Sequence, residues 1–120
     1  MQLKINLRIC DEDGQRFMGT GPYALLRGVQ KYGSIRKAAF SMAMSYAKAH
    51  RILSVLEKKL GFKLLTKHIG GSDHGGATLT PQALQFLEAY ESMKRGLQRA
   101  ADADWKQFCE KLASLRETNL

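Results

Sequence analysis

The segment over residues 33–61 constrains the fold more than any other part of the sequence. Ser34 follows a glycine that can end a helix, and it is a favourable N-cap for a helix over residues 35–42. Ser45 is a favourable N-cap for the next helix, over residues 46–60, which a second glycine ends. A very short link separates these helices. Two consecutive helices joined in this way are typical of a helix-turn-helix motif.

The side chains of these two predicted helices divide into inward and outward sets. The inward positions of the first helix include Ala38 and Ala39, whose small size lets two helices approach closely. In the second helix an apolar stripe recurs at spacings of three and four: Ala49, Ile52, Leu53, Leu56 and Leu60. The opposite face carries small, hydroxyl and basic side chains, namely Ala47, Lys48, Arg51, Ser54 and Lys58. Such an outward face is suited to contact a polyanion.

The sequence before the motif predicts a strand and a helix. Residues Leu3–Ile9 alternate apolar and polar side chains, which predicts a half-buried β-strand. The polar turn Asp11–Gly14 ends it. Gly19–Pro22 then predicts the start of a helix that runs to Tyr32.

The sequence after the motif predicts a β-hairpin. A glycine-rich loop over residues 70–76 separates two predicted strands, 63–69 and 77–80. A loop rich in glycine also suits a nucleotide phosphate, but this one lacks the Lys-Ser/Thr ending and the strand–loop–helix order of a P-loop. A hairpin directly after a helix-turn-helix is the wing of a winged-helix fold. We therefore predict a mainly α fold with a small β part, a winged helix-turn-helix domain over residues 1–80 with a leading β-strand.

The last predicted helix is long and carries one sustained apolar stripe. Thr80 is a favourable N-cap and Pro81 a favourable first residue, and the helix covers residues 81–116 before a tail at 117–120. The stripe includes Ala83, Phe86, Tyr90, Met93, Leu97, Ala101, Trp105, Phe108, Leu112 and Leu115. The helix is longer than the rest of the chain can cover, so we expect a homodimer. The expected dimer contacts are Tyr90, Met93, Leu97, Ala101, Trp105, Phe108 and Leu112.

Positive charge is concentrated in the middle of the chain. The whole sequence has 19 Lys and Arg against 11 Asp and Glu, for a formal net charge of +8. Between residues 27 and 68, ten side chains are basic and only Glu57 is acidic. A basic surplus confined to one region favours double-stranded DNA or another nucleic acid as a partner over a general role in solubility.

Several classes of protein are disfavoured by the sequence. No apolar run approaches the ~20 residues that span a bilayer, and the N-terminus lacks the apolar core of a signal peptide. We therefore expect a cytoplasmic, nucleoid-associated prokaryotic protein without membrane contact. Cys10 and Cys109 form neither a disulfide framework nor a zinc site, and no nucleophile–base pair indicates an enzyme. His68 and His74 flank the glycine loop as weak metal ligands at most, so we expect no cofactor.

Three motifs resemble one family of regulators. They are GSIRKAA at Gly33–Ala39, MSYAKA at Met44–Ala49, and two glycine pairs followed by ATLT over residues 70–80. In this order and spacing they resemble the N-terminal domain of ModE-type molybdate-responsive regulators, over residues 3–93. The leading strand separates that family from the related LysR-type regulators. The resemblance implies a dimeric winged helix-turn-helix protein that binds operator DNA in the major groove.

The chain departs from the ModE pattern at three positions. His50 stands where the family usually has tryptophan, His74 replaces the third glycine of the second glycine cluster, and Ala83 replaces the glycine of the LT-xx-G motif. Family members that sense oxyanions carry further C-terminal domains that bind molybdate or tungstate. This chain ends at Leu120, so we expect those domains to be absent and infer no oxyanion sensing.

The predicted DNA contacts come from both helices of the motif and from the wing. Ser34, Arg36 and Lys37 are expected on the phosphate backbone at the start of the first helix. The N-terminal half of the second helix is expected in the major groove, with Ser45, Tyr46, Ala47, Lys48, His50 and Arg51. There Arg51 suits guanine and Ala47 suits a thymine methyl group. Lys67 and His68 are expected to reach an adjacent phosphate or the minor groove from the wing.

Alternatives stay open for residues and for function. Lys48 and Arg51 also suit a solvated helix face, Tyr46 suits the core, and His50 suits a packing or dimer contact. One alternative function is non-specific architectural DNA binding. Another is an adaptor that dimerises and pairs with a separate effector-sensing protein.

Overall fold

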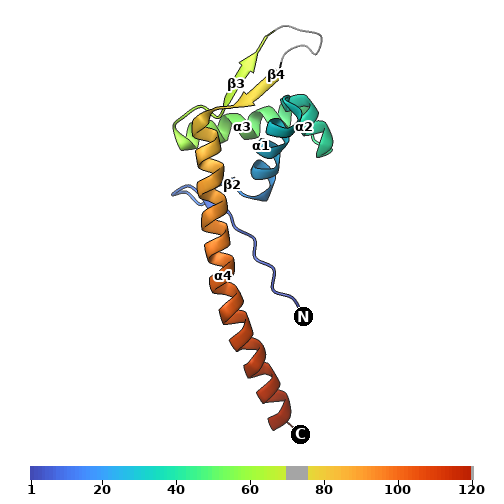
Figure 1. Cartoon of the computed structure of the whole chain (residues 1–120), viewed down its shortest axis with the longest axis vertical. Coiled ribbons are helices and arrows are strands. Elements are labelled where there is room, and N and C mark those ends of the chain that lie inside the picture. Colours follow the sequence, from blue (N-terminus) through green and yellow to red (C-terminus); the bar gives the residue numbers. More distant parts are fainter. Residues whose placement is uncertain (70–75, 120) are drawn as a thin grey trace. The chain divides into compact units, whose positions relative to one another are not determined.

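A computed structural model describes residues 1–69 and 76–119 of the 120-residue chain. Within these described residues, four helices and two antiparallel strand pairs follow one another (Figure 1). Their order is β1 (Ile9–Cys10), β2 (Arg16–Met18), α1 (Thr20–Tyr32), α2 (Ile35–Ser41), α3 (Tyr46–Leu60), β3 (Leu65–His68), β4 (Gly76–Leu79) and α4 (Pro81–Thr118). The predicted fold class, mainly α with a small β part and a long last helix, is confirmed.

The chain divides into two compact units, which are described separately. One unit is Asn6–Glu88, and it holds α1, α2, α3, all four strands and the first two turns of α4. The other consists of Met1–Ile5 and Ala89–Leu120, so it holds the rest of α4. The winged helix-turn-helix lies entirely within the first unit.

The core of the first unit is apolar. Among the residues that the structure describes, no polar or charged residue is buried. Helices α1 and α2 pack closely because small residues face each other: a Cβ atom placed on Gly28 would lie 2.9 Å from the Cβ of Ala38. The buried side chains are Met18, Leu25, Leu26, Val29, Ile35, Ala38, Ala39, Ala49, Leu53, Leu56, Leu64, Ala77, Ala83 and Leu87.

The helix boundaries follow the predicted caps. The Ser34 hydroxyl accepts a hydrogen bond from the Lys37 backbone N–H at 3.2 Å, and the Ser45 hydroxyl accepts one from the Lys48 N–H at 3.1 Å. Gly33, at the C-terminus of α1, has a φ of 68°, a left-handed conformation that glycine adopts readily. The predicted ranges of α2 and α3 are therefore confirmed.

The link between α2 and α3 is a tight turn held by backbone hydrogen bonds. The N–H groups of Met42 and Met44 both donate to the carbonyl of Ala39, at 3.0 and 2.9 Å. Ala43 has a φ of 52°, which is uncommon for a residue with a side chain. The turn thus fixes the angle at which α3 leaves α2.

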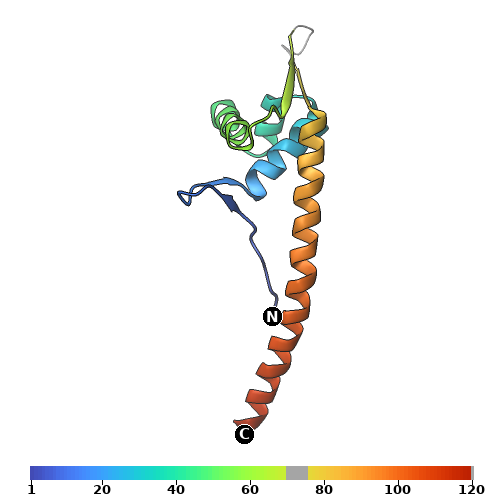
Figure 2. The same cartoon turned by 90° about the vertical axis from the view of Figure 1, so that its left-hand side faces the viewer.

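The wing is a two-stranded hairpin whose second strand is joined to the C-terminal end of α1. Strands β3 and β4 pair from Leu65↔Leu79 to His68↔Gly76, and Figure 2 shows them extending beyond α3, which is seen nearly end-on. The Ala77 N–H donates to the Gly33 carbonyl at 2.9 Å. A Cβ atom at position 76 would lie 2.9 Å from the same carbonyl, so this close approach requires glycine. The rest of the predicted glycine loop, residues 70–75, lies outside the described residues.

The predicted leading strand over Leu3–Ile9 is wrong. Only Ile9–Cys10 is a strand, and it pairs with the unpredicted strand Arg16–Met18. Alternation alone does not make a strand, because its backbone groups need a neighbouring strand. Residues 3–8 have none within the described part of the chain, and Leu3 and Ile5 stay 38% and 44% exposed.

The turn and the next helix agree more closely with the sequence. The Asp11 carboxylate accepts the backbone N–H groups of Asp13 and Gln15, each at 2.9 Å, which forms the predicted turn. Helix α1 begins at Thr20, two residues before Pro22, and ends as predicted.

Helix α4 starts where the sequence predicts and continues to Thr118. The Thr80 hydroxyl accepts a hydrogen bond from the Ala83 N–H at 3.1 Å and donates one to the Lys63 carbonyl at 2.7 Å. The Thr80 side chain therefore caps α4 and also binds the segment that leads into β3. None of the described helices has the length and apolar character that a membrane span requires.

One ion pair joins the β1–β2 turn to the C-terminal end of α3. The Lys59 ammonium lies 2.7 Å from a carboxylate oxygen of Asp11. This hydrogen bond, with those from the N–H groups of Gln15 and Asp13, holds the pKa of Asp11 below its ordinary value of 3.8. The Asp11 carboxylate likewise raises the pKa of Lys59 above 10.5. The ion pair therefore stabilises the fold between pH 3.8 and pH 10.5.

Replacing this carboxylate should produce a pH-dependent loss of stability. Because the pKa of Asp11 is lowered by folding, its contribution is present above pH 3.8 and is lost as the pH falls further. We expect Asp11→Asn to lower the melting temperature at pH 7 and to approach the wild type near pH 3, measured by circular dichroism. Asp13→Asn, in the same turn, is the control and should change the melting temperature much less. An equal difference at both pH values would contradict the role of the ion pair.

Candidate nucleic-acid interface

The N-terminal ends of α2 and α3 both open onto solvent. Arg36 and Lys37 follow the cap of α2 and are exposed, and Ala47 and Lys48 follow the cap of α3 and are exposed as well. Neither helix has an acidic residue in its first turn. The positive end of each helix dipole is therefore left for an external anion.

The two faces of α3 have the environments that the sequence predicts. Ala49, Leu53 and Leu56 are 0–2% exposed and form part of the core. The outward side chains are exposed: Tyr46, Ala47, Lys48, His50, Arg51, Ser54 and Lys58. Tyr46 is 40% exposed, so it lies at the surface and not in the core.

A row of side-chain contacts crosses from α2 over α3 to the wing. The Arg36 guanidinium lies over the Tyr46 ring, 4.9 Å from its centroid. The Tyr46 and His50 rings are 5.9 Å apart and tilted by 35°. The Nζ atom of Lys67 on β3 then lies 3.4 Å from Nε2 of His50. Four of the predicted DNA contacts are thus brought together on one surface.

His68 is not brought into this row. Its Nε2 atom lies 3.1 Å from the hydroxyl of Thr78 on the neighbouring strand. Successive side chains of a strand point to opposite faces, and Lys67 already faces α3. The structure therefore separates the two wing residues that the sequence grouped.

The single acidic residue of the basic region is engaged within the fold. One carboxylate oxygen of Glu57 accepts the Leu64 N–H at 2.7 Å, and the other lies 3.9 Å from the Lys63 ammonium. Glu57 thus ties the end of α3 to the start of the wing. Beside it, a groove of about 550 Å³ between α3 and β3 is also lined by His50, Ser54, Lys63 and Lys67.

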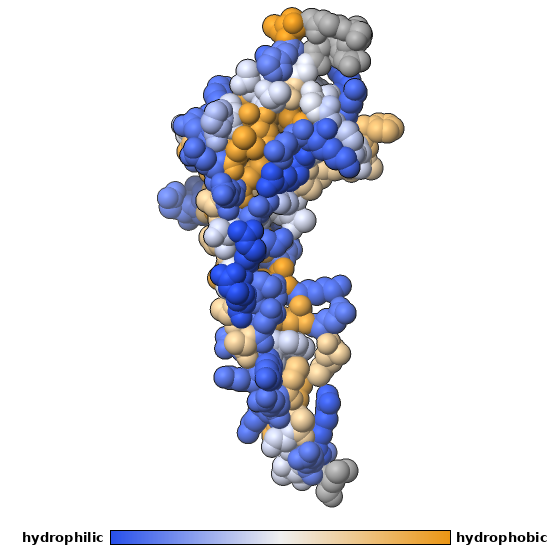
Figure 3. Space-filling model, viewed as in Figure 1, coloured by the Kyte–Doolittle hydropathy of each residue, from blue (hydrophilic) through white to orange (hydrophobic). Residues whose placement is uncertain are grey.

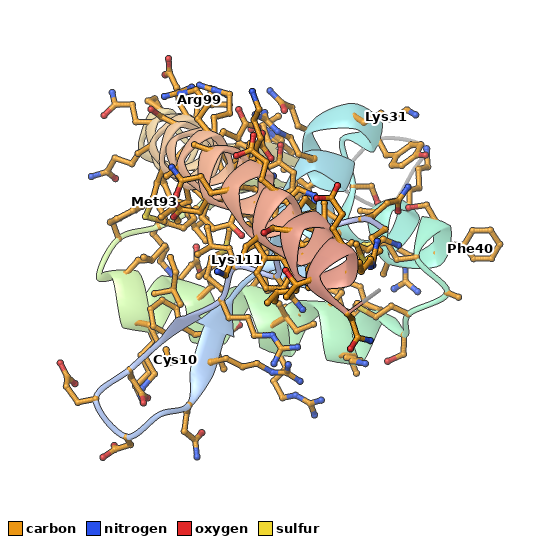
Figure 4. The ribbon with its side chains drawn as sticks, turned by 90° about the horizontal axis from the view of Figure 1, so that it is seen from below. Cys10, Lys31, Phe40, Met93, Arg99 and Lys111 are labelled. Carbon is orange, nitrogen blue, oxygen red and sulfur yellow. The ribbon has the colours of Figure 1, made fainter. Side chains whose placement is uncertain are left out.

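The sequence reasoning did not single out Phe40. Its ring is 84% exposed, and Figure 4 shows it pointing away from the helices. The sequence did contain a signal for this exposure. Ala38 and Ala39 face inward, and the next position along a helix points away from them. Phe40 lies directly before the turn of the motif, and it is a further exposed side chain near the candidate interface.

The described residues contain no group of three or more His, Cys, Asp or Glu that suits a metal ion. Cys10 and Cys109 are free thiols. His74, the second of the two histidines that the sequence placed beside the glycine loop, lies outside the described residues.

The fold and the exposed basic helix define a winged helix-turn-helix DNA-binding domain. No protein-family model matches the chain. Three proteins align with it: the transcriptional regulator ModE of Haemophilus influenzae, the molybdenum-pterin-binding protein MopB of Rhodobacter capsulatus, and the molybdenum transport protein ModE of Herbaspirillum seropedicae. These matches confirm the resemblance to ModE-type regulators that the sequence motifs indicated.

The alignments cover most of this chain and a smaller share of each relative. The identities are 34% over 76 residues, 32% over 89 and 30% over 93, which are 63%, 74% and 78% of this chain. The same alignments cover 30%, 33% and 33% of the relatives. The chain thus spans about a third of the length of the curated relatives it matches.

Solved structures of LysR-type DNA-binding domains share the fold. The DNA-binding domain of CbnR, in complex with DNA, is 25% identical with a TM-score of 0.52, over 69% of this chain and 90% of that one. The DNA-binding domain of BenM, in complex with benA site 1 DNA, is 19% identical with a TM-score of 0.51, over 71% and 90%. At this identity, the BenM domain shows the fold alone. Together with the relatives, the CbnR domain supports a DNA-binding domain of the kind that transcriptional regulators use, and none of these proteins is named as an enzyme.

Proposed function

We propose that the chain binds operator DNA as a homodimer and regulates transcription in a prokaryotic cytoplasm. The observation that carries this proposal is the row Arg36–Tyr46–His50–Lys67, which joins the two helices of the motif and the wing into one exposed, basic surface. Double-stranded DNA is the partner whose shape and charge this surface fits.

Binding would begin with electrostatic capture and end with reading of bases. The basic surface draws in the duplex, and each neutralised phosphate releases counterions, so affinity falls steeply with salt. The N-terminus of α2, with Ser34, Arg36 and Lys37, would hold the phosphate backbone. Helix α3 would enter the major groove, where Arg51 can donate two hydrogen bonds to guanine. Lys67 would hold a phosphate beside the groove.

The dimer would form through the part of α4 in the second unit. Its apolar stripe is incompletely covered: Met93, Leu97 and Phe108 are 43%, 46% and 53% exposed. Figure 3 shows apolar side chains at intervals among hydrophilic ones along this helix. Trp105 stacks on Phe108 with ring centroids 5.6 Å apart, which forms a flat apolar surface, and Ala101, Trp105 and Leu112 are half-buried. Tyr90 is only 4% exposed in the single chain and adds little to this stripe.

A second copy of the chain is the partner that would cover such a stripe with an equivalent one. Two α3 helices would then read two half-sites about 34 Å apart, or a multiple of that distance. The operator would be pseudo-palindromic.

Removing the guanidinium of Arg51 should weaken the preference for the selected sequence. We expect Arg51→Ala to lose about 1–3 kcal/mol of discrimination between its best duplex and a scrambled one, because the bidentate base contact is lost. The measurement is fluorescence anisotropy at several salt concentrations, with a duplex selected from a random-sequence library. Arg116→Ala, near the C-terminal end of α4, is the matched control and should bind as the wild type does.

The same titrations separate the rival functions. A wild-type preference above about 10³ for the selected duplex excludes architectural binding, whereas equal affinity for both duplexes would support it. If the wild type binds neither the selected nor the scrambled duplex, the DNA-binding proposal fails and the adaptor that pairs with a separate effector-sensing protein becomes the better account.

A charge in the apolar stripe of α4 should dissociate the dimer. We expect Phe108→Glu to reduce the mass in solution from twice 13.4 kDa to 13.4 kDa, because a carboxylate buried in an apolar interface lacks a partner. Gln107→Glu adds the same charge at the adjacent exposed position and should remain dimeric. Sedimentation velocity gives both masses. A Phe108→Glu variant that stays dimeric, or a monomeric wild type, would refute this interface.

A further inference from the structure

The contact between Lys67 and His50 has an unusual chemical character for a lysine on the surface. The Lys67 ammonium lies 3.4 Å from an imidazole nitrogen, whereas the neighbouring Lys63 faces the carboxylate of Glu57. A carboxylate partner orients an ammonium but also cancels its charge. A neutral imidazole accepts the hydrogen bond and leaves the positive charge whole.

The imidazole is itself held in place from the helix-turn-helix. The His50 ring lies against Tyr46, one turn earlier on α3, and the Tyr46 ring lies under the Arg36 guanidinium of α2. His50 is therefore braced on one side by an aromatic ring and faces the wing lysine on the other. The backbone of the wing is fixed separately, because Ala77, which pairs with Lys67 in the sheet, donates its N–H to the Gly33 carbonyl. The contact with His50 therefore sets the direction of the Lys67 side chain and the position of its charge.

We propose that His50 is a positioning residue for Lys67, and this inference rests on the proposed DNA-binding function. The imidazole holds the ammonium at the edge of the groove between α3 and β3, so that the wing and the recognition helix meet the duplex as one surface. The ligand of Lys67 is a phosphodiester of double-stranded DNA. His50 acts through Lys67 and contributes little to DNA binding when Lys67 is absent.

A double-mutant cycle isolates this role. His50→Phe keeps a ring against Tyr46 and removes the hydrogen-bond acceptor, and Lys67→Met keeps the side-chain length and removes the charge. With the duplex selected from a random library, we expect each single variant to bind roughly three- to ten-fold more weakly. In the Lys67→Met background, His50→Phe should then change the affinity by less than about two-fold.

Two controls distinguish positioning from other roles. The cycle of His50→Phe with Lys63→Met should give multiplicative effects, because Lys63 lines the same groove but faces Glu57. His50→Gln, which restores an acceptor, should recover most of the affinity lost in His50→Phe.

Each outcome of the double-mutant cycle either supports or overturns the role of His50. If His50→Phe costs nothing in the wild type, or costs the same in the Lys67→Met background, His50 does not position Lys67 and the inference is overturned while DNA binding stands. If the wild type selects no duplex at all, the proposed function itself fails, and the inference falls with it.

Discussion

The whole candidate DNA-binding surface depends on one junction, where the Ala77 N–H donates to the carbonyl of Gly33. Gly33 ends α1 in a left-handed conformation, Ser34 immediately caps α2, and Gly76 lets the wing strand come close enough for the bond to form. The positions of α1, α2 and the wing therefore depend on Gly33, Gly76 and the Ser34 hydroxyl. A side chain larger than hydrogen at position 76 would push the wing away from the helices.

Charged side chains and buried side chains occupy separate parts of the winged helix-turn-helix. The core of the described residues is apolar, and the one acidic residue in the basic region, Glu57, ties α3 to the wing through the Leu64 N–H. Among the basic side chains of α3, Lys59 pairs with Asp11 at the C-terminal end of the helix, whereas Lys48 and Arg51 are exposed on its outward face. Ring contacts connect the basic side chains at the two ends of this surface. The Arg36 guanidinium lies over the Tyr46 ring, the Tyr46 ring lies beside His50, and His50 contacts Lys67. A surface that is both basic and ordered can read a duplex as well as attract it.

The sequence predicted what depends on local chemistry. Ser34, Ser45 and Thr80 cap helices through bonds to residues three positions away, so the starts of α2, α3 and α4 follow from the sequence. The strand at Leu3–Ile9 was predicted wrongly because pairing depends on a partner that alternation does not reveal. For Tyr46 the sequence left both a DNA contact and a core position open, and the structure places it at the surface. The contact between His50 and Lys67 was beyond reach, because it depends on the angle between α3 and the wing, which helical periodicity does not fix.

The central claim is that one face, made of the N-terminal ends of α2 and α3 with the wing, meets the DNA. Backbone amide chemical shifts of the 13.4-kDa chain, recorded with and without the selected duplex, test this most directly. We predict the largest changes over residues 34–37, 45–51 and 66–68, and small changes in α1 and in the β1–β2 hairpin. Changes concentrated in α1 or the β1–β2 hairpin, with the start of α3 unaffected, would contradict the claim.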